Sequence, residues 1–126
     1  PTIKNKILKI LKIKGRTILF TTHDWSLASQ ITTKIAFIYK GRIINDIKSS
    51  KEILDSLPSL KMIIVEAKLK EILDLKLLKY YEHNDLLNIF YEEKSNLLDN
   101  VNKNTTRFSI QDSNLENAYL YLIKKL

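Results

Sequence analysis

The stretch TILFTTHD at residues 17–24 decides how the first half of the chain is expected to fold. Residues 17–22 are β-branched or apolar without polar alternation, which is typical of a strand covered on both faces. Before this stretch, apolar residues recur at helical spacing from a helix start at Pro1, and Gly15 ends that helix. A helix that leads into such a strand predicts one half of an α/β unit.

Local signals predict further elements between this stretch and Pro58. They are a short helix capped by Asp24, a hairpin with strands 35–39 and 42–47 that turns at Lys40 and Gly41, and a helix that opens with a capping box of Ser49 and Glu52. Pro58 closes the last of these helices, because proline disfavours helical geometry in the residue before it. We therefore expect a domain boundary at Pro58.

The second half follows a different order. The expected elements are strand 62–67, a short helix 70–73, strands 77–81 and 86–91 that turn at His83, Asn84 and Asp85, helix 93–101, strand 107–110, and a final helix that opens with a Ser113 and Glu116 capping box. One face of that final helix carries Leu115, Ala118, Tyr119, Leu122 and Leu126. The order βαββαβ with an added helix predicts a small split βαβ sandwich. A helix that continues from Leu69 past Leu77 remains an alternative to the hairpin.

The composition excludes several classes of function. The 126 residues include no cysteine, which excludes disulfides, thiolate zinc sites and cysteine nucleophiles. The sequence has two glycines, Gly15 and Gly41, so neither form of the glycine-rich phosphate loop can be written in it. No uncharged stretch reaches the roughly 18 apolar residues that a membrane-spanning helix needs.

The net charge of +7 belongs to the first half of the chain. Residues 1–50 hold ten Lys or Arg side chains against two Asp, whereas residues 51–126 hold eleven basic and twelve acidic side chains. Such asymmetry can indicate nucleic acid or anionic lipid as a partner. The interleaving of aromatic residues with Arg that single-strand binders use is absent, so we expect lysine-rich solvated faces and no nucleic-acid partner.

The residues GRTILFTTHD at 15–24, with Ala28 and KIAFIYKGRII at 34–44, resemble the end of the ATP-binding subunit of ABC transporters. In that family a helix leads into the last strand of the ATPase core, the strand ends at the switch histidine, and a basic-glycine hairpin follows. Two positions depart from the pattern: Thr33-Lys34 stands where the family usually has Asp-Arg, and Leu27 where an acidic residue is frequent. Neither position carries chemistry in the family.

A second resemblance lies near the C-terminus. The residues SNLENAYL at 113–120 look like the Leu-Glu-(Asp/Asn)-x-(Phe/Tyr)-Leu motif of drug- and sodium-export type subunits. The two resemblances thus lie near opposite ends of the chain.

The resemblance implies a fold of two parts. Residues 1–57 would be the C-terminal remnant of a P-loop ATPase α/β core, and residues 58–126 a C-terminal accessory α+β domain. The family's phosphate loop, glutamine loop, signature motif and catalytic glutamate lie upstream of the switch histidine, and the sequence contains none of them. The chain is thus expected to be a C-terminal fragment, inactive alone, of a subunit that hydrolyses ATP to drive transport.

His23 is the candidate catalytic residue, because it matches the switch histidine. The resemblance implies that in the intact subunit its imidazole contacts the γ-phosphate and the attacking water, where a histidine N–H is a suitable donor near neutral pH. ATP and Mg²⁺ are implied for that subunit, and no cofactor is expected for this chain alone.

The resemblance also implies the partners and location of the intact subunit. They are a transmembrane permease subunit and a second ATPase subunit, at the cytoplasmic, inner face of the membrane. The fragment itself is expected to self-associate through the open edges of strand 17–22.

The other candidate residues have structural interpretations. Asp24 fits a helix cap better than a proton acceptor, and Trp25 fits packing better than a functional role. His83, with Glu82 and Asp85, offers too few ligands of fixed geometry for a metal site. We expect packing or surface roles for the rest, namely Tyr80, Tyr81, Phe90, Tyr91, Glu92, Glu93 and Asp112.

A different class of function remains open on the sequence. The second half could be a stand-alone regulatory or protein-interaction module built on a ferredoxin-like βαββαβ domain.

Overall fold

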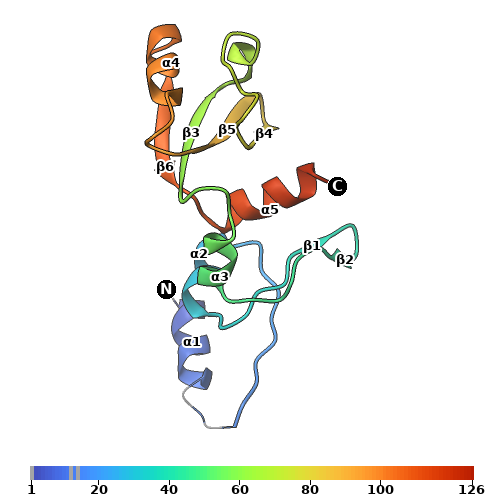
Figure 1. The fold of residues 1–126 in the computed structure, drawn as a ribbon. Helices are drawn as coiled ribbons and strands as arrows, with labels where there is room; N and C mark the ends of the chain where they lie inside the picture. Colours follow the sequence, from blue (N-terminus) through green and yellow to red (C-terminus); the bar gives the residue numbers. More distant parts are fainter. Residues whose placement is uncertain (1, 12, 14) are drawn as a thin grey trace.

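The computed structural model describes residues 2–11, 13 and 15–126, so the expected helix start at Pro1 lies outside the described residues. The helices of the described residues are α1 (Thr2–Leu11), α2 (Trp25–Ile31), α3 (Ser50–Asp55), the 3-10 helix η1 (Ala67–Leu69), α4 (Leu97–Asn104) and α5 (Leu115–Lys124). The strands are β1 (Ile38–Tyr39), β2 (Arg42–Ile43), β3 (Lys61–Glu66), β4 (Tyr80–His83), β5 (Leu86–Tyr91) and β6 (Phe108–Asp112). This mixture of helices and antiparallel sheets confirms the α/β class (Figure 1).

The second half forms the sheet at the top of Figure 1, with strand order β4-β5-β3-β6. β3 is antiparallel to both β5 and β6, and β4 is antiparallel to β5. Consequently β3 and β4 run parallel with β5 between them, and β5 and β6 run parallel with β3 between them. This is the predicted split βαβ topology. The connection between β3 and β4 differs from the prediction. It contains η1 and a series of turns, whereas we expected a helix at 70–73.

The hairpin of β4 and β5 is present in place of a helix that continues past Leu77. Its turn residues Asn84 and Asp85 both have positive φ, 52° and 61°, and lie between the paired residues His83 and Leu86. A two-residue turn with positive φ at both positions is type I′, which favours Asn, Asp and Gly because its twist matches that of the strands. The local turn chemistry therefore predicted the hairpin correctly, although its first strand is β4 at Tyr80–His83 and not residues 77–81.

Each face of this sheet has its own core, because side chains alternate along the strands. One face is packed against α4 and the segment that follows β3, and its fully buried strand residues are Ile63, Val65, Leu87 and Ile89. The other face is packed against α5, and its buried strand residues are Met62, Tyr81 and Phe90.

α5 is buried on two sides and lies between the sheet and the first half of the chain (Figure 1). One side carries Leu115, Ala118, Tyr119 and Leu122, which pack with residues of the first half such as Phe37 and Ile53. The other side carries Leu120 and Tyr121, which pack on the sheet. The predicted apolar face is therefore present, except that Leu126 is 78% exposed. The domain boundary at Pro58 stays a prediction. α5, which follows Pro58 in the chain, completes the core of the first half.

Residues 17–22 do not form the buried strand that the sequence predicts. They are irregular, and the Leu19 side chain is 95% exposed. A strand needs hydrogen-bonded neighbours and an apolar cover to be stable, and in the described chain no strand pairs with this stretch. β propensity alone was therefore a misleading guide at residues 17–22.

The first hairpin is shorter than predicted. β1 and β2 pair over two residues each, and the turn at Lys40 and Gly41 has positive φ at both positions. Beyond them the Asn45 side chain replaces part of the ladder. Its Oδ1 accepts the Phe37 N–H at 2.7 Å, and its Nδ2 donates to the Ile35 carbonyl at 3.2 Å.

The capping box of α3 is confirmed. Ser49 Oγ accepts the Glu52 N–H at 3.1 Å, and a Glu52 carboxylate oxygen accepts the Ser49 N–H at 3.3 Å. Hydrogen bonds to the Glu52 carboxylate, first from the Ser49 backbone N–H and then from the Ser49 side chain, lower the pKa of the Glu52 carboxyl below its usual value. α4 begins later than predicted, at Leu97 in place of Glu93, because residues 93–96 form turns and bends.

The predicted capping box of Ser113 and Glu116 is wrong by one residue. Asn114 and Asn117 form the box at the start of α5, with both side chain to backbone hydrogen bonds at 2.9 Å. The Asn117 Nδ2 also donates to the Tyr81 hydroxyl at 2.9 Å, so the cap ties α5 to β4. Burial raises the pKa of Tyr81 above its usual value.

Two leucine substitutions test the division between core and surface. We expect Leu87→Ala to lower the free energy of unfolding by about 2–5 kcal/mol, because Leu87 is 0% exposed and its loss leaves a cavity. Leu19→Ala is the matched control and should change it by less than about 0.5 kcal/mol, as surface substitutions do. Urea denaturation followed by circular dichroism measures both. A Leu19→Ala effect as large as that of Leu87→Ala would mean that residues 17–22 are buried after all.

Candidate functional site: the turn at His23 and the aromatic cluster beside it

His23 lies in a bend immediately before α2, and its side chain is exposed. Side chains hold the backbone on both sides of it. Thr22 Oγ1 accepts the Asp24 N–H at 2.9 Å, and Asp24 Oδ1 accepts the Leu27 N–H at 3.0 Å. His23 therefore sits in a short turn that is closed by Thr22 and by the N-cap of α2, and not at the end of a strand.

Asp24 acts as the helix cap that the sequence favoured over a proton acceptor. It is the N-cap of α2 with extended backbone geometry, and its carboxylate bonds a backbone N–H of the first turn. A carboxylate at this end also interacts favourably with the helix dipole.

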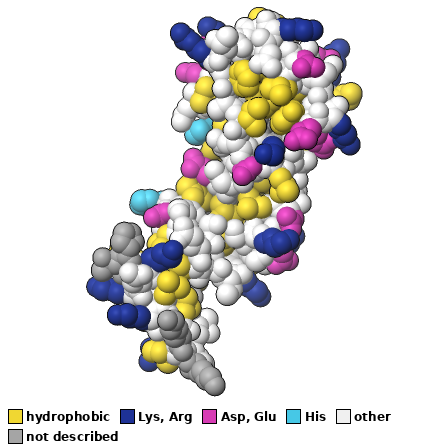
Figure 2. Space-filling model, turned by 90° about the vertical axis from the view of Figure 1, so that its left-hand side faces the viewer, with side chains coloured by type: hydrophobic (Ala, Val, Ile, Leu, Met, Phe, Trp, Pro, Cys, Tyr) yellow, Lys and Arg dark blue, Asp and Glu magenta, His cyan; other side chains and the backbone are white. Residues whose placement is uncertain are grey.

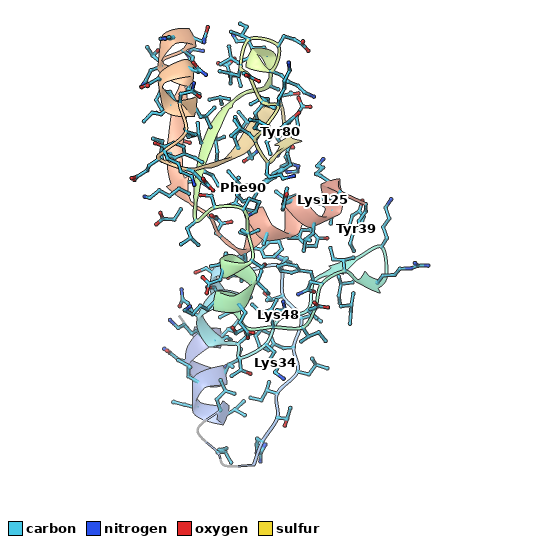
Figure 3. All side chains as sticks on the ribbon, in the orientation of Figure 1. Lys34, Tyr39, Lys48, Tyr80, Phe90 and Lys125 are labelled. Carbon is cyan, nitrogen blue, oxygen red and sulfur yellow. The ribbon has the colours of Figure 1, made fainter. Side chains whose placement is uncertain are left out.

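Trp25, Phe37, Tyr39 and Tyr119 form an aromatic cluster next to this turn. The Trp25 ring centroid lies 5.3 Å from that of Tyr119 and 6.0 Å from that of Phe37, and Phe37 and Tyr119 are 5.5 Å apart. Tyr39 adds an edge contact to Tyr119 at 6.4 Å. Figure 3 shows Tyr39 on the hairpin side of α5 and Phe90 on the sheet side. The packing role predicted for Trp25 is thus confirmed.

The contacts of Tyr119 in this cluster were not predicted from the sequence. Its hydroxyl donates to the Ile38 carbonyl at 3.0 Å, in addition to its ring contacts. The sequence placed Tyr119 on the apolar face of a helix and in the SNLENAYL motif. Its contact with Trp25 joins residues far apart in the chain, and no local pattern indicates it.

The other candidates are not brought together into a site. His83 is half-buried at the end of β4, and the described residues hold no cluster of three or more side chains that could bind a metal. Tyr80, Tyr81, Phe90 and Tyr91 pack in the two cores of the sheet, as predicted.

Two of the remaining candidate carboxylates, Glu92 and Asp112, lie in surface ion pairs. Glu92 lies 3.5 Å from the Lys94 ammonium, and Asp112 lies 3.5 Å from the Lys61 ammonium. Such exposed pairs contribute little to stability.

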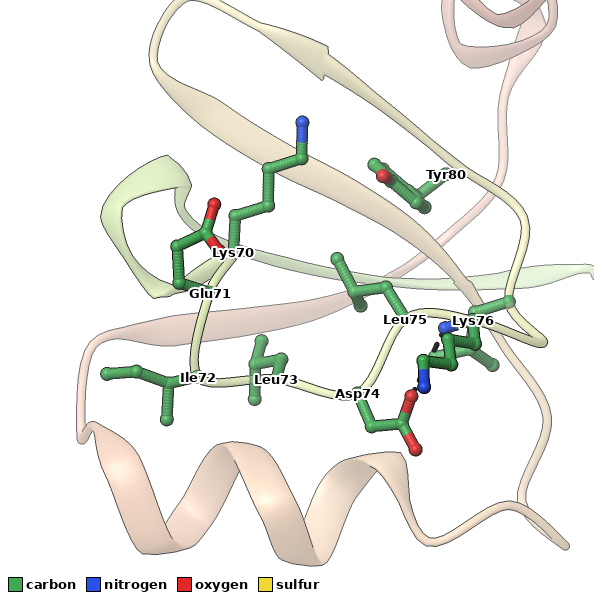
Figure 4. Close-up of a pocket in the computed structure, with 9 residues that line it drawn as sticks. Lys70, Glu71, Ile72, Leu73, Asp74, Leu75, Lys76 and Tyr80 are labelled. Carbon is green, nitrogen blue, oxygen red and sulfur yellow. Dashed lines mark hydrogen bonds between the residues drawn. The ribbon is translucent and has the colours of Figure 1, made fainter.

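An open depression lies beside the segment that connects η1 to β4 (Figure 4). Its lining includes Lys70, Asp74, Lys76 and Tyr80, and the Lys76 N–H donates to Asp74 Oδ1 at 3.3 Å. Lys70 Nζ lies 5.9 Å from the centre of the Tyr80 ring. These contacts stabilise a loop, and they do not converge on a common point.

The surface of the first half combines positive charge with exposed apolar side chains. Figure 2 shows Lys and Arg side chains beside apolar ones in the lower part of the molecule. Among the apolar side chains of residues 1–57, Leu19 is 95% exposed, Ile3 67% and Ile43 58%.

No helix in the part of the chain that the structure describes combines the length and the apolar character required to cross a membrane.

Comparison with known proteins gives a short likeness to two ATP-binding proteins. The chain is similar to the fluoroquinolones export ATP-binding proteins of two strains of Mycobacterium tuberculosis, CDC 1551 / Oshkosh and H37Rv. Each is 45% identical over 38 residues, which make up 30% of this chain and 13% of the relative. The match therefore spans a small part of each relative's length. No protein family model and no solved structure matches the chain.

Two substitutions at Asp24 distinguish a cap from a proton acceptor. We expect Asp24→Ala to lower the free energy of unfolding by about 1 kcal/mol, because an orphan N–H of α2 loses its acceptor. Asp24→Asn keeps an oxygen acceptor at the same place and should retain most of the stability. Urea denaturation measures both variants, and equal losses for Asn and Ala would contradict the capping role.

Proposed function

We propose that the chain is the C-terminal part of an ABC transporter ATP-binding subunit, with residues 1–57 completing its ATPase domain. The likeness to export ATP-binding proteins carries this proposal at the level of the family. The match covers 13% of each relative, and we propose that the activity belongs to a larger protein of which this chain supplies a part. No comparison supports the alternative of a stand-alone regulatory module.

The surface of the first half supports this proposal. Its exposed apolar side chains, with Leu19 as the extreme case, are those that a larger ATPase domain would cover. In that setting residues 17–22 gain strand neighbours, and their β-branched and apolar composition suits a central strand. Residues 17–22 offer no strand edge for the self-association expected from the sequence, so we propose that the chain self-associates through the exposed apolar side chains of its first half.

His23 is the residue to which we assign chemistry. It follows the strand-like run and precedes a capped helix and a hairpin with Gly41 at its turn, which is the order found around the switch histidine of the family. In this role its imidazole N–H donates toward the γ-phosphate and helps position the attacking water. The ATP and Mg²⁺ belong to the whole subunit, and we propose that the chain alone binds neither.

The finer assignments are proposals as well. SNLENAYL at 113–120 supports the drug- and sodium-export type, with residues 58–126 as an accessory domain. The subunit would work at the cytoplasmic face of a membrane, with a transmembrane permease and a second ATP-binding subunit as partners.

A graft tests the role of His23. The corresponding C-terminal part of a fluoroquinolones export ATP-binding protein is replaced by this chain, and ATP hydrolysis is measured. We expect the graft to hydrolyse ATP and His23→Ala to lower its kcat by about 10²–10³-fold, the usual cost of removing one donor to the developing charge.

The control for this graft is His83→Ala, which removes the other histidine of the chain and should leave kcat unchanged. An inactive graft, or equal activity in the two histidine variants, would contradict the proposed function.

A further inference from the structure

The position of His23 depends on the first turn of α2. His23 is spanned by the hydrogen bond from the Asp24 N–H to Thr22 Oγ1, and Asp24 in turn caps α2. Trp25 is the first residue of that helix. Whatever holds Trp25 therefore also holds the turn that presents His23 to solvent.

Trp25 is held by a closed triangle of aromatic rings. It contacts Tyr119 and Phe37, and these two rings contact each other, with centroid separations of 5.3, 6.0 and 5.5 Å. All three separations lie in the range of about 4.5–7 Å over which aromatic pairs attract. Phe37 comes from the same half of the chain as His23, whereas Tyr119 comes from α5.

Tyr119 is held in place by its own hydrogen bond and by the packing of the opposite side of α5 on the sheet. Its hydroxyl donates to the Ile38 carbonyl at 3.0 Å. On the opposite side of α5, Tyr121 packs on Phe90 with ring centroids 4.8 Å apart, and Asn117 donates to the Tyr81 hydroxyl. The sheet thus anchors the helix that carries Tyr119.

We infer that Tyr119 is a positioning residue for His23, supplied by the C-terminal segment to the turn that begins α2. The inference rests on the function proposed above for His23. Tyr119 belongs to the predicted accessory segment and His23 to the predicted ATPase segment. The accessory segment therefore contributes to the geometry of the ATPase site, and it does so without touching nucleotide.

Nuclear magnetic resonance relaxation of the full chain tests this inference directly. The backbone order parameter of the His23 amide should be near 0.85 in the wild-type chain and fall below about 0.6 in Tyr119→Leu. The emission of Trp25, the single tryptophan, should shift to longer wavelength in the same variant, because Trp25 loses an aromatic neighbour and gains water. Tyr119→Phe keeps the ring contacts and should restore both signals to wild-type values.

Tyr121→Leu is the matched control, because it removes an aromatic ring from the same helix on the side that faces the sheet. It should leave the His23 order parameter and the Trp25 emission unchanged. If Tyr119→Leu does not fold, Tyr119→Met fills similar space with a flexible side chain and carries the same expectation.

An unchanged His23 order parameter in Tyr119→Leu would overturn the inference. An equal loss in Tyr121→Leu would overturn it too, because it would show a general loosening of α5. Neither measurement involves ATP, so failure here is distinct from an inactive graft, which would reject the function proposed for His23.

Discussion

The burial of α5 on two opposite sides is the constraint on which the rest of the structure depends. Ala118 and Tyr119 complete the core of the first half, whereas Leu120 and Tyr121 cover one face of the sheet. A helix of ten residues is too short to be stable in water by propensity alone, so packing on both sides stabilises it. The hydrogen bonds of Asn117 and Tyr119, one to each side, fix its rotation about its axis.

Where local chemistry decides the outcome, the sequence predicted the fold well. The β4–β5 hairpin follows from Asn84 and Asp85, which tolerate the positive φ of a type I′ turn. The α3 capping box follows from the spacing of Ser49 and Glu52. The strand order of the sheet followed from the order of the elements, even though the first crossover lacks its helix.

Where distant contacts decide the outcome, the sequence predicted less. Residues 17–22 have the composition of a buried strand, yet strand formation depends on neighbours that their own side chains cannot supply. α5 shows one conspicuous apolar stripe, and its second contact surface depends on Asn117 and Tyr121, which are polar or amphipathic. At the candidate site, the Asp24 cap is a local feature and was predicted, whereas the contact of Tyr119 with Trp25 is a tertiary feature.

The coding sequence immediately upstream of the Pro1 codon gives the most direct test of membership in an ABC transporter ATP-binding subunit. We expect an open reading frame that continues upstream and encodes, before Pro1, a glycine-rich phosphate loop, a signature motif and a catalytic glutamate. An in-frame stop codon close to Pro1, or a continuous frame without a phosphate loop, would contradict this assignment.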